Sequence, residues 1–218
     1  SDAVADNQIL PAHRILIIDE AHHLQKAAYR YFGVEIAPWL IHQTLDKFFH
    51  SGPDNFGHLA TLNRLITEAG AASGDREPLL RIIHQAEKDI GELRKRVKAF
   101  FDEFLQHYND TKRKPTQKYT DKRRYTPEKH PFDKLINTPN LEKQARTLLA
   151  RLSDLQKKLD ALPPALAGRF DDDLGDFSFA VENMKNLADN LGILLHPDKD
   201  DWVYWYEMPV DTTSTHIT

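Results

Sequence analysis

The sequence contains no cysteine. The chain therefore has no disulfide, no thiolate zinc site and no cysteine ligand for an iron–sulfur cluster within this sequence, as expected for a cytosolic protein. It also lacks any hydrophobic run near the roughly 18 apolar residues that a membrane-spanning helix requires, and its first residues do not resemble a signal peptide. We expect a cytoplasmic protein that has no membrane partner. Its 218 residues, 40% of them hydrophobic, suffice for one large globular domain or two small ones.

The formal net charge of −4 is small, but charge is distributed unevenly. Residues 111–130 contain eight Lys or Arg and two acids, a net charge of +6, which leaves −10 for the rest of the chain. A basic segment with interspersed tyrosines is typical of single-stranded nucleic-acid binding, because cations contact phosphates and rings stack on bases. The alternative is a solvated loop. The predicted DNA-binding residues are Lys112, Arg113, Lys114, Lys118, Tyr119, Lys122, Arg123, Arg124 and Tyr125.

Strand signals occur near the two ends of the chain. ILII at 15–18 is a short apolar run typical of a buried parallel strand. WVYWYEMPV at 202–210 is rich in aromatic and β-branched residues, and Pro209 restricts it to a sheet edge or a strand end. The sequence between these two segments favours helix.

Three apolar series with heptad spacing predict the helical core, because spacings of three and four place residues on one side of a helix. The first runs from Ile83 to Phe104, the second from Leu141 to Leu162, and the third from Phe177 to Leu194. Shorter helices are predicted at 22–32, 38–50 and 57–70. The first long helix, at about 78–107, should pack antiparallel to the second, with the basic stretch at the tip of the hairpin. The predicted fold class is mainly α, a helical bundle with short β-strands near both termini.

The segment ILIIDEAHHL, residues 15–24, places Asp19 and Glu20 at the end of the first predicted strand. Ligands bind at the carboxyl ends of strands in open parallel sheets. In P-loop ATPases an Asp at this place holds Mg²⁺, usually through water, and an adjacent Glu polarises the attacking water. The acids alone are also explained by a helix cap, but that explanation requires neither the aliphatic strand nor the following histidine.

The ILIIDEAHHL segment resembles motif II of superfamily 2 DNA helicases in the form used by the DinG and XPD group. In that family a large helical insertion, the arch domain, follows DEAH before the chain returns to the first motor domain. The resemblance implies three parts: residues 1–24 end motor domain 1, residues 25–198 form the arch, and residues 199–218 return to the motor. The match is tight over residues 13–24 and extends to the rest of the chain only in layout.

The resemblance also implies roles and partners. Asp19, through water, and Glu20 would form the Mg²⁺ site. Glu20 and His22 would be the catalytic residues: Glu20 as the base for water attack, and His22 as the link from the nucleotide site to the other motor domain. His23 has no role in the motif. The implied cofactor is Mg-ATP, and the implied partners are single-stranded or forked DNA and the rest of the motor. The family's iron–sulfur cysteines lie upstream of DEAH, as does a fused DnaQ-like exonuclease in some members. A bacterial member would be nucleoid-associated.

The sequence lacks the phosphate-binding loop that an ATPase needs, GxxxxGK[ST]. Gly52 and Gly57 have the glycine spacing, but His58 and Leu59 follow them, and Pro53 removes a backbone donor. We therefore expect a turn here. We also expect that the chain is a piece of a helicase and does not hydrolyse ATP alone.

Two alternatives belong to other classes of protein. The first is a non-enzymatic helical interaction module in which DEAH is fortuitous. The second is a metal-dependent helical oxygenase, because Glu20-x-x-His23 has the spacing of a di-iron half-site. Such sites use two of these motifs, and no second Glu-x-x-His occurs in the sequence.

Overall fold

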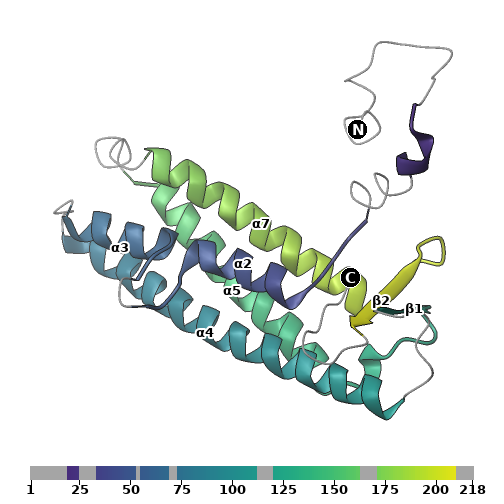
Figure 1. Cartoon of the computed structure of the whole chain (residues 1–218). Coiled ribbons are helices and arrows are strands. Elements are labelled where there is room, and N and C mark those ends of the chain that lie inside the picture. Colours follow the sequence, from purple (N-terminus) through teal and green to yellow (C-terminus); the bar gives the residue numbers. More distant parts are fainter. Residues whose placement is uncertain are drawn as a thin grey trace. The chain divides into compact units, whose positions relative to one another are not determined.

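The structure, a computed structural model, describes residues 19–24, 33–52, 55–68, 73–111, 120–162 and 171–209 (Figure 1). The chain divides into two compact units, Ser1–Glu35 and Ile36–Thr218. The predicted ILII strand and most of the predicted helix at 22–32 lie outside the described residues. In the described part of the first unit, Ala21–His23 forms a three-residue 3-10 helix, η1.

The second unit is built mainly from helices, which confirms the predicted fold class. They are α2 (Pro38–Phe48), α3 (His58–Glu68), α4 (Ser73–Asp110), α5 (Thr138–Asp160) and α7 (Asp171–Leu195). The helices predicted at 38–50 and 57–70 are α2 and α3. The first long helix is longer at both ends than the predicted 78–107, since α4 begins at Ser73 and ends at Asp110. Among the described residues, no helix is long and apolar enough to cross a membrane.

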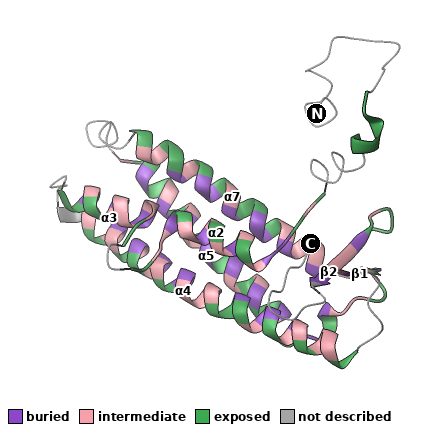
Figure 2. Ribbon diagram, viewed as in Figure 1, coloured by how far each residue is buried: buried purple, intermediate pink, exposed green. Residues whose placement is uncertain are grey.

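The heptad series form the core of the second unit (Figure 2). The α4 residues from Ile83 to Phe104 at these spacings are all buried. The α5 residues from Leu141 to Leu159 are buried as well, and Leu162 packs against the core from a partly exposed position. In α7 the series from Phe177 to Leu191 is buried. The seams therefore face one another, as the spacing predicted.

Side-chain contacts show the direction of the long helices. The Glu103 carboxylate of α4 accepts a hydrogen bond from the backbone N–H of Ile136, just before α5, at 2.8 Å. Farther back along α4, the Asp89 carbonyl accepts one from Gln144 of α5 at 3.3 Å. Residue numbers thus rise along α4 as they fall along α5, which confirms the antiparallel hairpin. The pairs Glu142–His196 and Gln156–Ser178 show that α5 and α7 are also antiparallel.

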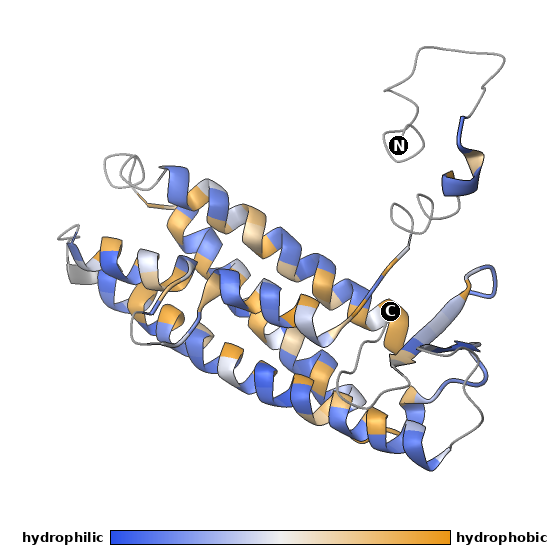
Figure 3. Cartoon of the chain, viewed as in Figure 1, coloured by the Kyte–Doolittle hydropathy of each residue, from blue (hydrophilic) through white to orange (hydrophobic). Residues whose placement is uncertain are grey.

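A two-stranded antiparallel sheet joins the middle of the chain to its C-terminal part. Strand β1 (Thr120–Tyr125) pairs with β2 (Tyr204–Pro209), with Thr120 opposite Pro209 and Tyr125 opposite Tyr204. Pro209 lies at a strand end, as predicted. The prediction that strands occur only near the chain ends is wrong, because β1 lies in the basic stretch. This strand is hydrophilic (Figure 3), and its backbone pairing with β2 gives it an extended conformation that its side chains do not favour.

The inner face of the sheet belongs to the helical core. Tyr125 of β1 and Tyr204 and Met208 of β2 are all buried in the same hydrophobic cluster as the α4 and α5 seams. The domain boundaries predicted after residues 24 and 198 remain predictions. In the structure, β2 lies in the same compact unit as the helices.

The Gly52–Gly57 segment lies between α2 and α3, where a β-bridge pairs His50 with Phe56. Gly57 has a φ of 108°, and a Cβ atom here would lie 2.6 Å from the Phe48 carbonyl oxygen. Glycine is therefore required for a close backbone turn. The described residues thus show a close turn at Gly57, while Pro53 and Asp54 of the expected turn lie outside the described residues.

Candidate functional site

The DEAH residues form a tight turn on the protein surface. Glu20 has φ 52° and ψ 42°, in the left-handed region that residues other than glycine seldom occupy. The Asp19 carboxylate accepts a hydrogen bond from the Glu20 N–H at 2.9 Å. The Glu20 carbonyl accepts another from the His23 N–H, also at 2.9 Å. These two bonds hold the backbone that presents the side chains of Glu20, His22 and His23.

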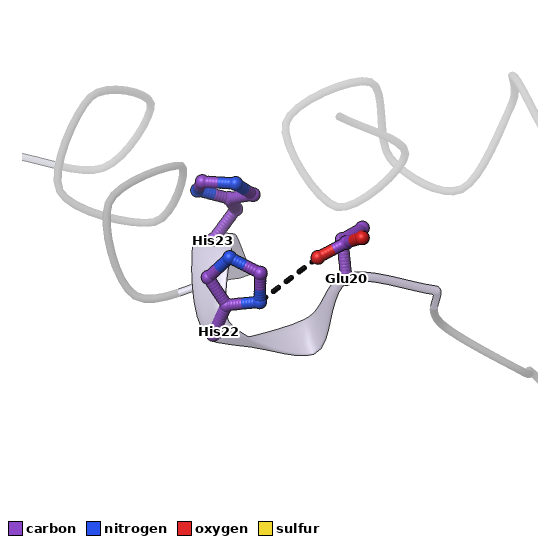
Figure 4. Close-up of side chains that lie close together, drawn as sticks. All are labelled: Glu20, His22 and His23. Atoms are coloured by element: carbon purple, nitrogen blue, oxygen red, sulfur yellow. Dashed lines mark ion pairs between the residues drawn. The ribbon is translucent and has the colours of Figure 1, made fainter.

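The side chains of the turn lie close together (Figure 4). A Glu20 carboxylate oxygen, Oε2, lies 3.0 Å from Nδ1 of His22, and both side chains are about two-thirds exposed, at 67% each. The His22 and His23 rings are tilted against each other with centroids 4.0 Å apart. One ligand atom from each of Glu20, His22 and His23 can be chosen so that all three lie within 4.8 Å of one another.

This arrangement differs from the predicted pair of acids. The motif assigns Mg²⁺ to Asp19 and the base to Glu20, whereas the structure brings Glu20 together with two histidines and turns the Asp19 carboxylate toward its own backbone. The helicase motif gave no role to His23, which entered only the di-iron alternative, as part of Glu20-x-x-His23. The sequence could have indicated this cluster, since a carboxylate followed by two adjacent histidines supplies three metal-binding side chains within four residues.

The predicted DNA-binding residues divide into two groups. Lys112, Arg113, Lys114, Lys118 and Tyr119 lie outside the described residues. The other four, Lys122, Arg123, Arg124 and Tyr125, lie on β1. Because successive strand residues point to opposite faces of a sheet, these four cannot form one surface.

The outer face of the sheet carries Lys122 and Arg124, both exposed. The Lys122 ammonium lies 2.8 Å from a carboxylate oxygen of Glu207 and 4.4 Å from the centre of the Trp205 ring. Arg124 stands opposite Trp205 in the strand register. This face thus combines two cations, one of them paired with Glu207, with a partly exposed indole ring. Trp205 was not among the predicted DNA-binding residues. The alternation of side chains along β2 could have placed it on this face.

The inner face holds Arg123 in a buried network. The Asp121 side chain is fully buried and accepts hydrogen bonds from Arg123 Nε at 2.6 Å and from the Tyr108 hydroxyl at 2.7 Å. The Arg123 guanidinium also lies 5.0 Å from the centre of the Tyr108 ring. Burial, followed by the hydrogen bond to Asp121, raises the pKa of Tyr108 to about 12. The Arg123 charge is therefore compensated inside the protein.

Tyr125 is 7% exposed, and its hydroxyl donates a hydrogen bond to the Leu194 carbonyl at 3.1 Å. Its ring packs against Phe132 and Tyr204, with centroids 5.4 Å away in both cases, and burial raises its pKa. A ring enclosed in this way cannot stack on a nucleic-acid base. The prediction that Tyr125 stacks on DNA is corrected: its position in the strand points it into the core.

No protein-family model, no curated protein and no solved structure matches the chain. The function is therefore inferred from the residues and their geometry.

Proposed function

We propose that the chain contains motif II and the arch of an ATP-dependent DNA helicase of the DinG type. The observation that carries this proposal is the segment ILIIDEAHHL, in which four aliphatic residues lead into DEAH. The helical bundle that follows supports it, since the family places a helical insertion at this point. A phosphate-binding loop and a second motor domain are also needed, and the proposal places them elsewhere in the parent polypeptide.

In this proposal Asp19 would hold the magnesium of Mg-ATP through water, and the ion would supply charge compensation on the phosphates. Glu20 accepts the proton of the attacking water, and its exposed carboxylate is open to solvent and ligand. His22 lies 3.0 Å from that carboxylate and can orient it. The helicase acts in the cytoplasm, on single-stranded or forked DNA.

The outer face of the β1–β2 sheet supplies the DNA contact in the proposal. Arg124 pairs with a phosphate, and Lys122 does so by exchanging its carboxylate partner Glu207. The partly exposed Trp205 ring, which now lies against the Lys122 ammonium, would stack on a base when Lys122 moves to the phosphate. The positive charges of residues 112–118 lie directly before β1 in the sequence and extend the same basic segment.

The proposal is tested in the full-length parent protein by Glu20→Gln. Hydrolysis should be abolished, since an amide cannot accept the proton, while ATP binding stays within about twofold of wild type because the shape is kept. Steady-state ATPase assays and equilibrium binding of a fluorescent ATP analogue measure the two effects. Loss of binding together with hydrolysis would show that Glu20 is structural. Unchanged hydrolysis would favour the alternative, a helical interaction module with a fortuitous DEAH sequence.

A further inference from the structure

The described part of the first unit brings three metal-binding side chains together on one turn. We propose that Glu20, His22 and His23 bind a divalent transition-metal ion of the Zn²⁺ class. Two of these ligands, Glu20 and His22, are also the base and its orienting partner in the proposed function, so the ion and the catalytic role would compete for them. The metal proposal itself does not rest on the helicase function.

The distances fit one small ion. Zinc binds imidazole nitrogen and carboxylate oxygen at about 2.0–2.2 Å, so two ligands of a tetrahedral ion lie about 3.4 Å apart. Glu20 Oε2 and His22 Nδ1 are 3.0 Å apart, and the ligand atom of His23 lies within 4.8 Å of both. Rotation about the side-chain bonds of exposed His23 can close the remaining gap. Figure 4 shows the Glu20 carboxylate facing the His22 ring, with the His23 ring beside it.

The donor set selects the class of ion. Two imidazoles and one carboxylate are a common set for zinc sites that keep a fourth position for water. Imidazole also suits Cu²⁺, Ni²⁺ and Co²⁺, whereas Mg²⁺ prefers oxygen ligands in an octahedral arrangement. The site should therefore discriminate strongly against Mg²⁺.

The backbone holds the ligands in place before an ion arrives. The left-handed Glu20 and the bond from the His23 N–H to the Glu20 carbonyl fix the turn. All three ligands come from four consecutive residues, so binding does not require a second segment to be ordered. Their exposure leaves a direct path for the ion from solvent.

Isothermal titration calorimetry of the 218-residue chain with ZnCl₂, and separately with MgCl₂, tests the proposal without nucleotide. The variants are His22→Ala, His23→Ala and Glu20→Gln. The matched control is His84→Ala, because His84 on α4 is also an exposed histidine paired with a glutamate, Glu87 at 3.2 Å, but without a third ligand. Circular dichroism checks that each variant keeps the helical content of the wild type.

We expect one saturable Zn²⁺ site in the wild type and none for Mg²⁺ at the same concentrations. Each substitution in the turn should weaken Zn²⁺ binding by roughly tenfold or more, since loss of even an outer-shell partner costs metal sites 10–100-fold. His84→Ala should bind as the wild type does. The proposal would be overturned if His22→Ala and His23→Ala bound Zn²⁺ as tightly as the wild type. It would also be overturned if His84→Ala lost as much Zn²⁺ affinity as the variants in the turn, which would show non-specific binding to histidines. These results do not depend on ATP hydrolysis, so failure here leaves the Glu20→Gln test of the proposed function unaffected.

Discussion

At the scale of single residues, the most informative side chain is Asp121. Its carboxylate has no solvent exposure and is held by Arg123 and by the Tyr108 hydroxyl. A sequence rule would place an aspartate in a basic stretch on the surface. The structure instead uses it to neutralise an arginine that the strand alternation turns inward.

Asp121→Asn keeps the shape of the side chain but removes its charge. Arg123, which is 17% exposed, would then lie in the interior without its anion. We expect a loss of about 3 kcal/mol in the free energy of unfolding, measured by urea denaturation of the 218-residue chain. Asp102→Asn is the control, because Asp102 is 62% exposed and pairs with Lys98, which is 77% exposed, on the surface of α4. Its cost should stay below about 0.5 kcal/mol, and equal costs in the two variants would contradict the buried role of Asp121.

At the scale of elements, α5 begins without a side-chain cap of its own, since Asn137 at its N-cap makes no such bond. Glu103 of α4 takes over this function. Its carboxylate accepts hydrogen bonds from the backbone N–H groups of Ile136 and Asn137, at 2.8 and 3.0 Å, and from the Asn137 side chain at 2.8 Å. Two backbone donors near the helix start thus receive an acceptor from another helix.

This contact makes stability depend on pH. Burial raises the pKa of Glu103, but the hydrogen bonds from Ile136 and Asn137 outweigh that effect and lower it. A lowered folded-state pKa gives stability that is present above the unfolded-state pKa and is lost as pH falls through the folded value. Glu103→Gln should therefore be less stable than the wild type at pH 7, and the difference should shrink as the solution is acidified below pH 4. Urea denaturation at both pH values measures it.

The control for the Glu103 prediction is Glu92→Gln. Glu92 pairs with Lys95 on the exposed surface of α4 and contacts no helix end. Its replacement should change the stability little at either pH. A constant deficit of Glu103→Gln across the acid range would show that packing, and not charge, explains the role of Glu103.

The helices could be predicted because their information is local. The heptad spacings in α4, α5 and α7 follow from 3.6 residues per turn, and every one of these helices was found. Strand β1 could not be predicted in this way. Five of its six residues, TDKRRY, are polar, and its partner β2 lies about 80 residues later in the chain. Its extended conformation is set by that distant pairing.

The candidate sites also divide into features set by local sequence and features set by the folded structure. The DEAH acids could be identified from their motif, whereas the proximity of His23 depends on the left-handed backbone of Glu20. On β1, the charge composition identified the cations but did not show on which face of the sheet each one lies. Once the strand is known, alternation separates Lys122 and Arg124 from Arg123 and Tyr125.

At the scale of the whole molecule, the DNA-binding test can be restricted to the two cations on the outer face of the sheet. In the full-length protein, Lys122→Glu with Arg124→Glu should weaken single-strand binding and lower the salt slope by about 0.7 for each phosphate that is no longer neutralised. Fluorescence anisotropy with a labelled oligonucleotide at two salt concentrations measures both. Lys157→Glu with Lys158→Glu, on the exposed face of α5, is a control of equal charge change. Should both double variants behave alike, the sheet carries no specific DNA contact.

The pairing of β1 with β2 also determines which residues the helical core needs for its stability. Residues 199–218 were predicted to return to a motor domain, and a chain ending at Asp198 would then keep an intact bundle. In the structure, however, Tyr204 and Met208 are 2% and 1% exposed and lie in the core cluster of the helices. The Phe104 ring of α4 packs edge-to-face against Tyr206 at 5.2 Å. Removing β2 would therefore open the core beside α4.

We accordingly expect the chain ending at Asp198 to be much less stable than the 218-residue chain. Loss of two buried side chains costs at least about 4 kcal/mol, since truncating one large core side chain costs about 2–5 kcal/mol. For a protein of this size that corresponds to a fall of at least roughly 8–16 °C in Tm, measured by circular dichroism at 222 nm. Val203→Ala, at a position 55% exposed just before β2, should leave Tm nearly unchanged. If the shortened chain melts at the temperature of the intact one, β2 contributes nothing to the helical core, and its energetic partner must be sought in the motor domain that the helicase proposal requires.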